Sequence, residues 1–292
     1  MKKIQFALTV EEGKTLISEG IIRSDILKDK TKNGKVLFKG GTTVSRITEK
    51  LIGKSLRICG RVTRRGTVCG AGNSSAPHSI LLDGEKIIHL EENMLEESLG
   101  LGPKDLIITG ANAFDQYGNA ALMAGGSGGD YPGMALTSWY TEGADCIITV
   151  GLEKLVPGNL NEKINKTGRK SVNHSWGMSV GLMRLPGVVY NELHALESLY
   201  DINVYVIGSG GIYDAKGATV FEAVGNSLEI DELTDIIDKI KKEEHYISGD
   251  PSSLEECSRG SINCKDHLGC LYLSKLPANS NMQNGGFDRY GN

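Results

Sequence analysis

The stretch Lys35-Val-Leu-Phe-Lys-Gly-Gly-Thr-Thr-Val-Ser-Arg-Ile-Thr-Glu-Lys-Leu-Ile52 contains the pattern that decides the fold. Its apolar start predicts a strand, Gly40-Gly41-Thr42-Thr43 predicts a tight turn, and apolar residues three or four apart then predict a helix. This arrangement leaves backbone N–H groups unpaired at the helix N-terminus, where the helix dipole attracts phosphate or carboxylate. The alternative is that a threonine hydroxyl only caps the helix.

The rest of the chain continues this alternation of strands and helices. Residues 9–32 predict amphipathic helix, and residues 79–90 predict a hairpin around Asp83-Gly84. Strands are predicted at 105–109, 120–123, 145–150, 204–207 and 218–224, and helices at 94–99, 134–142, 189–200 and 230–242. We therefore expect an α/β, Rossmann-like fold: a largely parallel sheet with helices on both faces, one β-hairpin insertion and an irregular C-terminal tail. The expected divisions are an N-terminal helical segment (1–34), the Rossmann-like domain (35–247) and a cysteine-containing tail (248–292).

Composition excludes several classes of partner. The net charge is −4 over 292 residues, which gives no field that would favour nucleic acid. The apolar runs are of strand length and the first residues show no cleavage-site pattern, so we expect neither a membrane span nor a signal peptide. The expectation is a cytoplasmic protein with no nucleic-acid or membrane partner, and a homo-oligomer is left open. The 38 glycines cluster between apolar runs, which indicates turns that approach a ligand closely.

A second set of turns follows the strand at 105–109. A polar turn holds Asn112, Asp115 and Asn119, and a short strand then leads into Gly125-Gly126-Ser127-Gly128-Gly129. Two such turns on one sheet edge predict the floor and wall of one pocket, where successive N–H groups can hold an anion. The predicted ligand-binding residues are Gly40, Gly41, Thr42, Thr43, Asn112, Asn119, Gly125, Gly126, Ser127, Gly128, Gly129, Ser209, Gly210 and Gly211.

Two carboxylates are candidates for acid–base catalysis. Asp115 is the leading one because it lies in the polar turn, and Glu192 is the second because it begins a helix after a strand. The alternative for Glu192 is a solvated position beside an apolar helix face. The turn at Ser209-Gly210-Gly211 closes the same pocket or is a plain exit from a strand.

These turns resemble the superfamily of ribose-5-phosphate isomerase A, glucosamine-6-phosphate deaminase, the CoA transferases and the DeoR-type sugar-sensing regulators. Gly41-Thr42-Thr43 is similar to the phosphate-gripping turn of that group, and Gly110–Asp115 and Ala124–Gly128 are similar to two later turns of the isomerase. The likeness covers roughly residues 35–225 in order. It implies a Rossmann-like fold that acts on or binds a small phosphorylated, carboxylated or CoA-type metabolite.

The isomerase's own catalytic groups are replaced in this chain. Asn112 stands in place of the first aspartate of the isomerase turn, and Ala124 stands in place of its lysine. Neither side chain can move a proton, so we do not expect ribose-5-phosphate isomerisation. The expected function is binding, and transformation if Asp115 is active, of a small anionic metabolite. The alternative is a non-catalytic metabolite sensor.

The C-terminal tail offers a third hypothesis. Cys257, Cys264, His267 and Cys270 are soft ligands within one short stretch, although they lack the close Cys-x2-Cys spacing of zinc sites. Free thiols are the alternative, so no metal is assigned. No cofactor is firmly implied; the resemblance leaves coenzyme A open, and the tail leaves a metal ion open.

Overall fold

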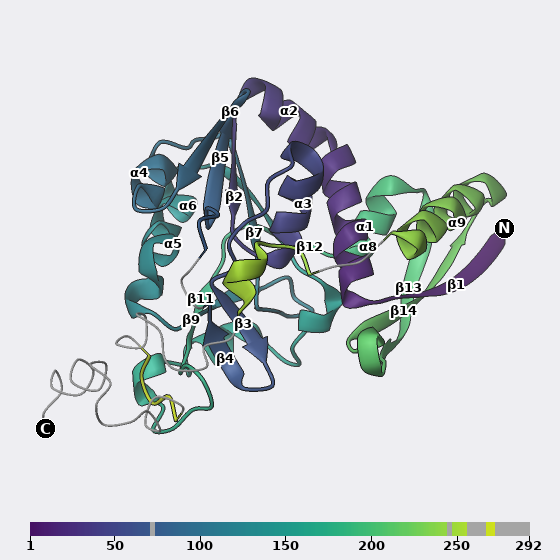
Figure 1. Cartoon of the computed structure of the whole chain (residues 1–292). Coiled ribbons are helices and arrows are strands. Elements are labelled where there is room, and N and C mark those ends of the chain that lie inside the picture. Colours follow the sequence, from purple (N-terminus) through teal and green to yellow (C-terminus); the bar gives the residue numbers. More distant parts are fainter. Residues whose placement is uncertain (71–73, 244–246, 256–266, 272–292) are drawn as a thin grey trace, which may run out of the picture.

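The computed structural model describes residues 1–70, 74–243, 247–255 and 267–271. A six-stranded sheet lies at its centre, with strands in the order β12-β10-β7-β2-β5-β6 (Figure 1). These strands are β2 (Lys35–Lys39), β5 (Ser79–Asp83), β6 (Lys86–Leu90), β7 (Leu106–Gly110), β10 (Asp145–Thr149) and β12 (Val188–Tyr190). The strands β2, β7, β10 and β12 run parallel, whereas β5 and β6 are antiparallel to their neighbours.

Helices cover both faces of this sheet because its strands are apolar on both sides. Val36 and Phe38 of β2 belong to one buried cluster, and Leu37 belongs to another. The first cluster takes in side chains of α1, α2 and α3, and the second takes in side chains of α4 and α6, so the molecule has three layers (Figure 1). The helices are α1 (Val10–Arg23), α2 (Asp25–Asn33), α3 (Thr42–Ile52), α4 (Met94–Leu99), α5 (Asp130–Met134) and α6 (Leu136–Thr141).

A separate antiparallel sheet stands beside this three-layered body. It consists of β1 (Lys2–Leu8), β14 (Ala218–Gly225) and β13 (Ile202–Gly210), in that order. Side chains of α1, α8 (Glu192–Leu199) and α9 (Ser227–Lys242) form a buried cluster with it. In this cluster Phe6 stacks on Phe221 with 5.4 Å between ring centroids. Figure 1 shows this sheet and α9 on the side of the molecule away from α4 and α5.

Smaller elements complete the described part of the chain. A three-stranded antiparallel sheet contains β8 (Ala113–Phe114), β9 (Ala120–Ala124) and β11 (Gly181–Arg184), with α7 (Leu160–Ile164) packed against β9 and β11. The strands β3 (Gly60–Thr63) and β4 (Gly66–Cys69) form a hairpin. Single 3-10 turns lie at η1 (Ser127–Gly129), η2 (Leu152–Lys154), η3 (Arg169–Ser171), η4 (Tyr213–Ala215) and η5 (Pro251–Leu254).

The structure confirms an α/β fold with helices on both sheet faces. Its central sheet is mixed, with parallel and antiparallel pairs, so the expected largely parallel, Rossmann-like sheet stays a prediction. The hairpin at 79–90 is not an insertion, because β5 pairs with β2 and extends the central sheet. The predicted strands at 120–123, 204–207 and 218–224 exist but belong to other, antiparallel sheets. Only residues 211–217 connect β13 to β14, and a parallel crossover needs a dozen residues or more. Short connections therefore impose antiparallel pairing there.

The predicted domain boundaries at 34 and 247 stay predictions. The helices α1 and α2 of the first segment pack on the central sheet, and β1 pairs with β14 along its whole length. In the parts of the chain that the structure describes, no helix combines the length and the apolar composition needed to cross a bilayer.

Candidate functional site

A cavity of about 900 Å³ lies where the loops after the parallel strands converge. The segments that follow β2, β7 and β10 all line it, through Gly40–Thr43, Gly110–Asn112 and Glu153–Val156. The carboxyl ends of parallel strands share one edge of a sheet, and ligands of α/β proteins gather at that edge. The structure thus brings the predicted turn at Gly40–Thr43 and Asn112 of the predicted polar turn to one cavity.

The N-terminus of α3 forms one part of the cavity wall. Gly41 is the N-cap residue and makes no side-chain capping bond, so the first N–H groups of the helix keep their capacity to donate. Thr43 lies in the first turn, is 2% exposed and lines the cavity. Its hydroxyl oxygen is buried and has no hydrogen-bond partner among the described residues. A buried hydroxyl without a partner costs free energy, and a ligand that accepts its proton would remove that cost.

Two further polar groups line the same cavity. Lys154 follows β10, is half-buried, and burial is the main cause that lowers the pKa of its ammonium. Asn112 follows β7, and its Oδ1 accepts a hydrogen bond of 2.9 Å from the backbone N–H of Met123. That bond fixes the amide and leaves its Nδ2 to donate to a ligand. Both groups add donors of the kind that an anion needs.

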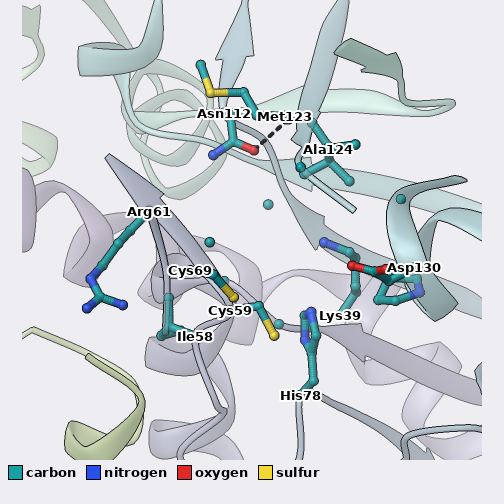
Figure 2. Close-up of a pocket in the computed structure, with 18 of the residues that line it drawn as sticks. Lys39, Ile58, Cys59, Arg61, Cys69, His78, Asn112, Met123, Ala124 and Asp130 are labelled. Carbon is teal, nitrogen blue, oxygen red and sulfur yellow. Dashed lines mark hydrogen bonds between the residues drawn. The ribbon is translucent and has the colours of Figure 1, made fainter. Parts of the chain in front are cut away.

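A buried lysine forms a second part of the wall. Lys39 ends β2, is 7% exposed, and burial lowers the pKa of its amine to about 8 against the opposing effect of Cys59. Burial, and next the charge of Lys39, lower the pKa of His78 to about 4, so its imidazole is neutral at pH 7. Figure 2 shows Lys39, Cys59 and His78 gathered along one side of the cavity with Asp130 beside them. A Cβ on Gly40 would overlap the His78 ring and carbonyl oxygen, so glycine is required there.

An ion pair holds the loop that carries these groups. Arg57 and Glu91 form a salt bridge of 2.5 Å, and the other oxygen of Glu91 accepts from the backbone N–H of His78 at 2.9 Å. Arg57 also donates to Cys59 Sγ at 3.4 Å. Burial raises the pKa of the Cys59 thiol, which keeps it protonated near neutral pH. The Glu91 carboxylate is therefore engaged by its own loop and does not neutralise Lys39.

The segment around η5 closes the cavity beside the β3–β4 hairpin. Ser253 Oγ accepts a hydrogen bond of 2.9 Å from the backbone N–H of Ile58. Arg61 donates to the carbonyl oxygens of Ser253 and Glu255 at 3.0 and 2.7 Å. Ser253, Arg61 and His267 all line the cavity. Residues distant in sequence thus contribute to the cavity wall.

The predicted glycine turn after β9 reaches the cavity only in part. Gly125, Gly126 and Gly129 line it, whereas Ser127 and Gly128 are not among its lining residues. Ser127 Oγ instead accepts a hydrogen bond of 3.3 Å from Arg169. A Cβ on Gly126 would overlap the carboxylate of Asp130, so part of this turn packs against a side chain of the following helix.

Asp115 and Asn119 do not line the cavity. The Asp115 carboxylate accepts hydrogen bonds from the backbone N–H groups of Leu160 at 2.7 Å, Tyr117 at 2.9 Å and Asn119 at 3.0 Å. Burial opposes these bonds, but together they lower the pKa of Asp115. Asn119 donates to the same carboxylate and accepts from Asn161 at 2.9 Å. The structure gives both residues a role in holding the β8–β9 turn against α7.

Glu192 lies next to the cavity without lining it. It is 4% exposed and accepts a hydrogen bond of 2.9 Å from the backbone N–H of Leu152. Burial, and next the neighbouring Glu153, raise its pKa to about 7. It is therefore not the solvated helix residue of the alternative hypothesis. Glu153 and Lys154 line the cavity, whereas Glu192 does not, and its predicted catalytic role stays a prediction.

The remaining predicted residues lie elsewhere. Ser209, Gly210 and Gly211 are exposed at the end of β13 in the separate sheet, so they do not close this cavity. Cys257 and Cys264 lie outside the described residues. His267 lines the cavity, and the backbone of Cys270 forms an isolated parallel β-bridge with that of Ser175. Among the residues that the structure describes there is no group of three or more ligands that could hold a metal ion.

Sequence analysis missed Lys39, Cys59, His78 and Lys154 as site residues. One pattern pointed to Lys39: it follows Leu37 at the strand period of two and ends an apolar strand directly before the glycine turn. A lysine on the buried side of a strand is unusual enough to count as a candidate. Nothing in the local sequence distinguishes the other three.

Comparisons with known proteins add no assignment. A scan against models of protein families finds no match, and searches of curated proteins and of solved structures find none either. The resemblance to the isomerase and CoA-transferase superfamily stays a prediction.

Proposed function

We propose that the cavity binds a small metabolite by its phosphate or carboxylate group, with the anion at the N-terminus of α3. The observation that carries this proposal is the buried hydroxyl of Thr43, which has no partner among the described residues and belongs to a residue that lines the cavity. The N–H groups of the first helical turn supply further donors, and the helix dipole favours negative charge at the same place. Lys154 and the Nδ2 of Asn112 complete a set of donors around one anionic group.

The size and composition of the cavity support a small ligand. Pockets for small molecules span roughly 300–1,000 Å³, and this cavity of about 900 Å³ falls within that range. Its charged lining residues are Lys39, Arg57, Arg61, Lys154, Glu91, Asp130 and Glu153. Arg57 is paired with Glu91 and Arg61 donates to backbone carbonyl oxygens, so among the described lining residues Lys39 and Lys154 are the cations that we assign to the ligand.

Ribose-5-phosphate isomerisation is not part of this proposal. Asn112 and Ala124 line the cavity at the two motif positions where the isomerase pattern has an acid and a lysine, and neither can transfer a proton. A non-catalytic sensor would use the same anion site, so turnover decides between the two functions.

The test is thermal protection and calorimetric titration with inorganic phosphate, glycerol 3-phosphate, acetate and coenzyme A. Uncharged glycerol is the control for glycerol 3-phosphate. We expect saturable protection by at least one anion that glycerol does not reproduce. Absence of protection by every anion at millimolar concentration would refute the proposed function. Consumption of a bound ligand would identify an enzyme, and stoichiometric binding without consumption would identify a sensor.

A further inference from the structure

We propose that Lys39 is a catalytic amine that forms an imine with a carbonyl group of the bound metabolite. This inference rests on the proposed function, because the anion at α3 is what positions the carbonyl. It names the substrate class as small phosphorylated or carboxylated aldehydes and ketones.

The position of Lys39 is the first argument. It ends β2, and the turn to α3 follows at once, so only Gly40 and Gly41 separate it from Thr42. Three residues span at most about 10 Å between Cα atoms, which is within the reach of one small metabolite. Lys39 and the α3 N-terminus line the same cavity, so one ligand can contact both.

The surroundings of Lys39 are the second argument. Among the described residues, no carboxylate lies within ion-pair distance of its amine; the groups facing it are the Cys59 thiol, the His78 ring and Asp130 of α5 (Figure 2). The nearest loop carboxylate, Glu91, is held by Arg57. Lys30 shows the contrast: it is also buried, but it pairs with Asp145 at 2.7 Å and donates to the Pro103 carbonyl at 2.8 Å.

The protonation of Lys39 is consistent with this role. With a pKa of about 8, roughly a quarter of the amine is neutral at pH 7.5, against about a thousandth for an ordinary lysine. A neutral amine is the nucleophilic form, and burial is a recognised way to produce it. The proposal is carried by the cavity, by the place of Lys39 at the end of β2, and by an amine with no ion-pair partner among the described residues; this protonation supports it.

The step balances without an oxidant or a reductant. The lone pair of the neutral amine bonds to the carbonyl carbon, and the C–O π electrons move to oxygen, which takes a proton to give a carbinolamine. The nitrogen lone pair then expels this oxygen with a second proton, and a C=N bond forms. The carbonyl oxygen and the two amine protons leave together as water.

Borohydride trapping tests the imine directly. The full-length protein is incubated with dihydroxyacetone phosphate or pyruvate, reduced with sodium borohydride, and mapped by peptide mass spectrometry. We expect about one covalent equivalent for at least one of these compounds, located on Lys39 and blocked by inorganic phosphate. Lys30 should stay unmodified. Lys39→Met should lose the adduct, and if that variant does not fold, the wild-type peptide map still decides.

The outcomes separate this inference from the proposed function. Thermal protection by phosphate together with no adduct on Lys39 overturns the imine and leaves the anion site intact. Labelling spread over surface lysines and insensitive to phosphate also overturns it. Absence of thermal protection by every anion tested refutes the proposed function itself. A Lys39 adduct whose rate falls about tenfold for dihydroxyacetone phosphate in Thr43→Val supports both, since the anion contact then positions the carbonyl.

Discussion

Replacement of Thr43 by valine exchanges one hydroxyl for a methyl group at a position that is 2% exposed. In the unfolded chain that hydroxyl bonds to water, and in the folded protein it has no partner among the described residues. A buried polar group left without a hydrogen bond costs about 1–3 kcal/mol. Thr43→Val should therefore raise the free energy of unfolding by about 1 kcal/mol or more, against the usual direction of substitutions.

The same substitution should weaken the binding of an anion. When a phosphate occupies the site, the Thr43 hydroxyl donates to a charged oxygen, and such a bond is worth about 1.5–3 kcal/mol. Its loss corresponds to a rise in the Kd of about tenfold to a hundredfold. The variant is thus expected to gain stability and lose affinity together, which is the pattern of a residue kept for function.

Urea denaturation of the ligand-free protein measures the first effect, and calorimetric titration with inorganic phosphate measures the second. Thr149→Val is the matched control, because its hydroxyl is equally buried but donates to the Thr109 carbonyl at 3.3 Å and does not line the cavity. It should lose about 1 kcal/mol of stability and keep the phosphate affinity of the wild type. Equal destabilisation by both substitutions, or an unchanged Kd in Thr43→Val, would refute the reasoning.

Three further predictions follow from buried groups near the cavity. The Lys39 amine has a pKa of about 8 in the folded protein, against its usual 10.5. Between these pH values the folded protein has lost a proton that the unfolded chain still binds, so the stability of the wild type relative to Lys39→Met should rise by about 3 kcal/mol from pH 7 to pH 11. A difference in stability between the two proteins that stays constant over this pH range would contradict the prediction. For Glu192 the pKa is raised in the folded protein, to about 7 against 4.5, so the stability of the wild type should fall as the pH rises from 4.5 to 8. In denaturation experiments Glu192→Gln should be as stable as the wild type at pH 4 and about 3 kcal/mol more stable than the wild type at pH 8. Gly40→Ala should lower the free energy of unfolding by about 1–3 kcal/mol, because the new Cβ meets the ring and the carbonyl oxygen of His78. Gly60→Ala is the control: its Cβ meets nothing within 4 Å, and it should change stability by less than about 0.5 kcal/mol. Equal shifts in melting temperature for the two variants would contradict the packing argument.

Features set by short-range pattern could be predicted from the sequence. The strand, glycine turn and helix at 35–52 lie where the apolar spacing places them, and the helix at 94–99 has the predicted bounds. The edge of the sheet at which these turns lie also follows from the sequence, because the loops that follow parallel strands all begin at the same edge. Gly40–Thr43 follow β2 and Asn112 follows β7, and they meet at one cavity for that reason.

Features set by long-range pairing could not be predicted in the same way. β1 alternates exposed residues with partly or fully buried ones over Lys3–Leu8, yet its partner β14 lies some two hundred residues further along the chain. The direction of each strand depends on such partners, so a mixed sheet looks like a parallel one in the sequence. The prediction for Asp115 shows the same limit, because the backbone N–H of Leu160 that holds it comes from another segment.

The burial of Lys39 has the same origin. Its place at the end of β2 is local, but the groups around it come from the loop before β3, from the start of β5 and from α5. Only the folded chain brings the Cys59 thiol, the His78 imidazole and the Lys39 amine together. Sequence patterns could therefore place the turn at Gly40–Thr43 where we propose that an anion binds, whereas the surroundings of Lys39 needed the tertiary structure.

The most direct test of the anion site is a crystal structure of the protein with glycerol 3-phosphate, collected near the concentration that saturates binding in solution. The account predicts density for the phosphate at the N-terminus of α3, within hydrogen-bond distance of Thr43 Oγ1 and the first N–H groups of the helix. A phosphate bound elsewhere in the cavity or on the surface, with the Thr43 hydroxyl still unpartnered, would contradict it.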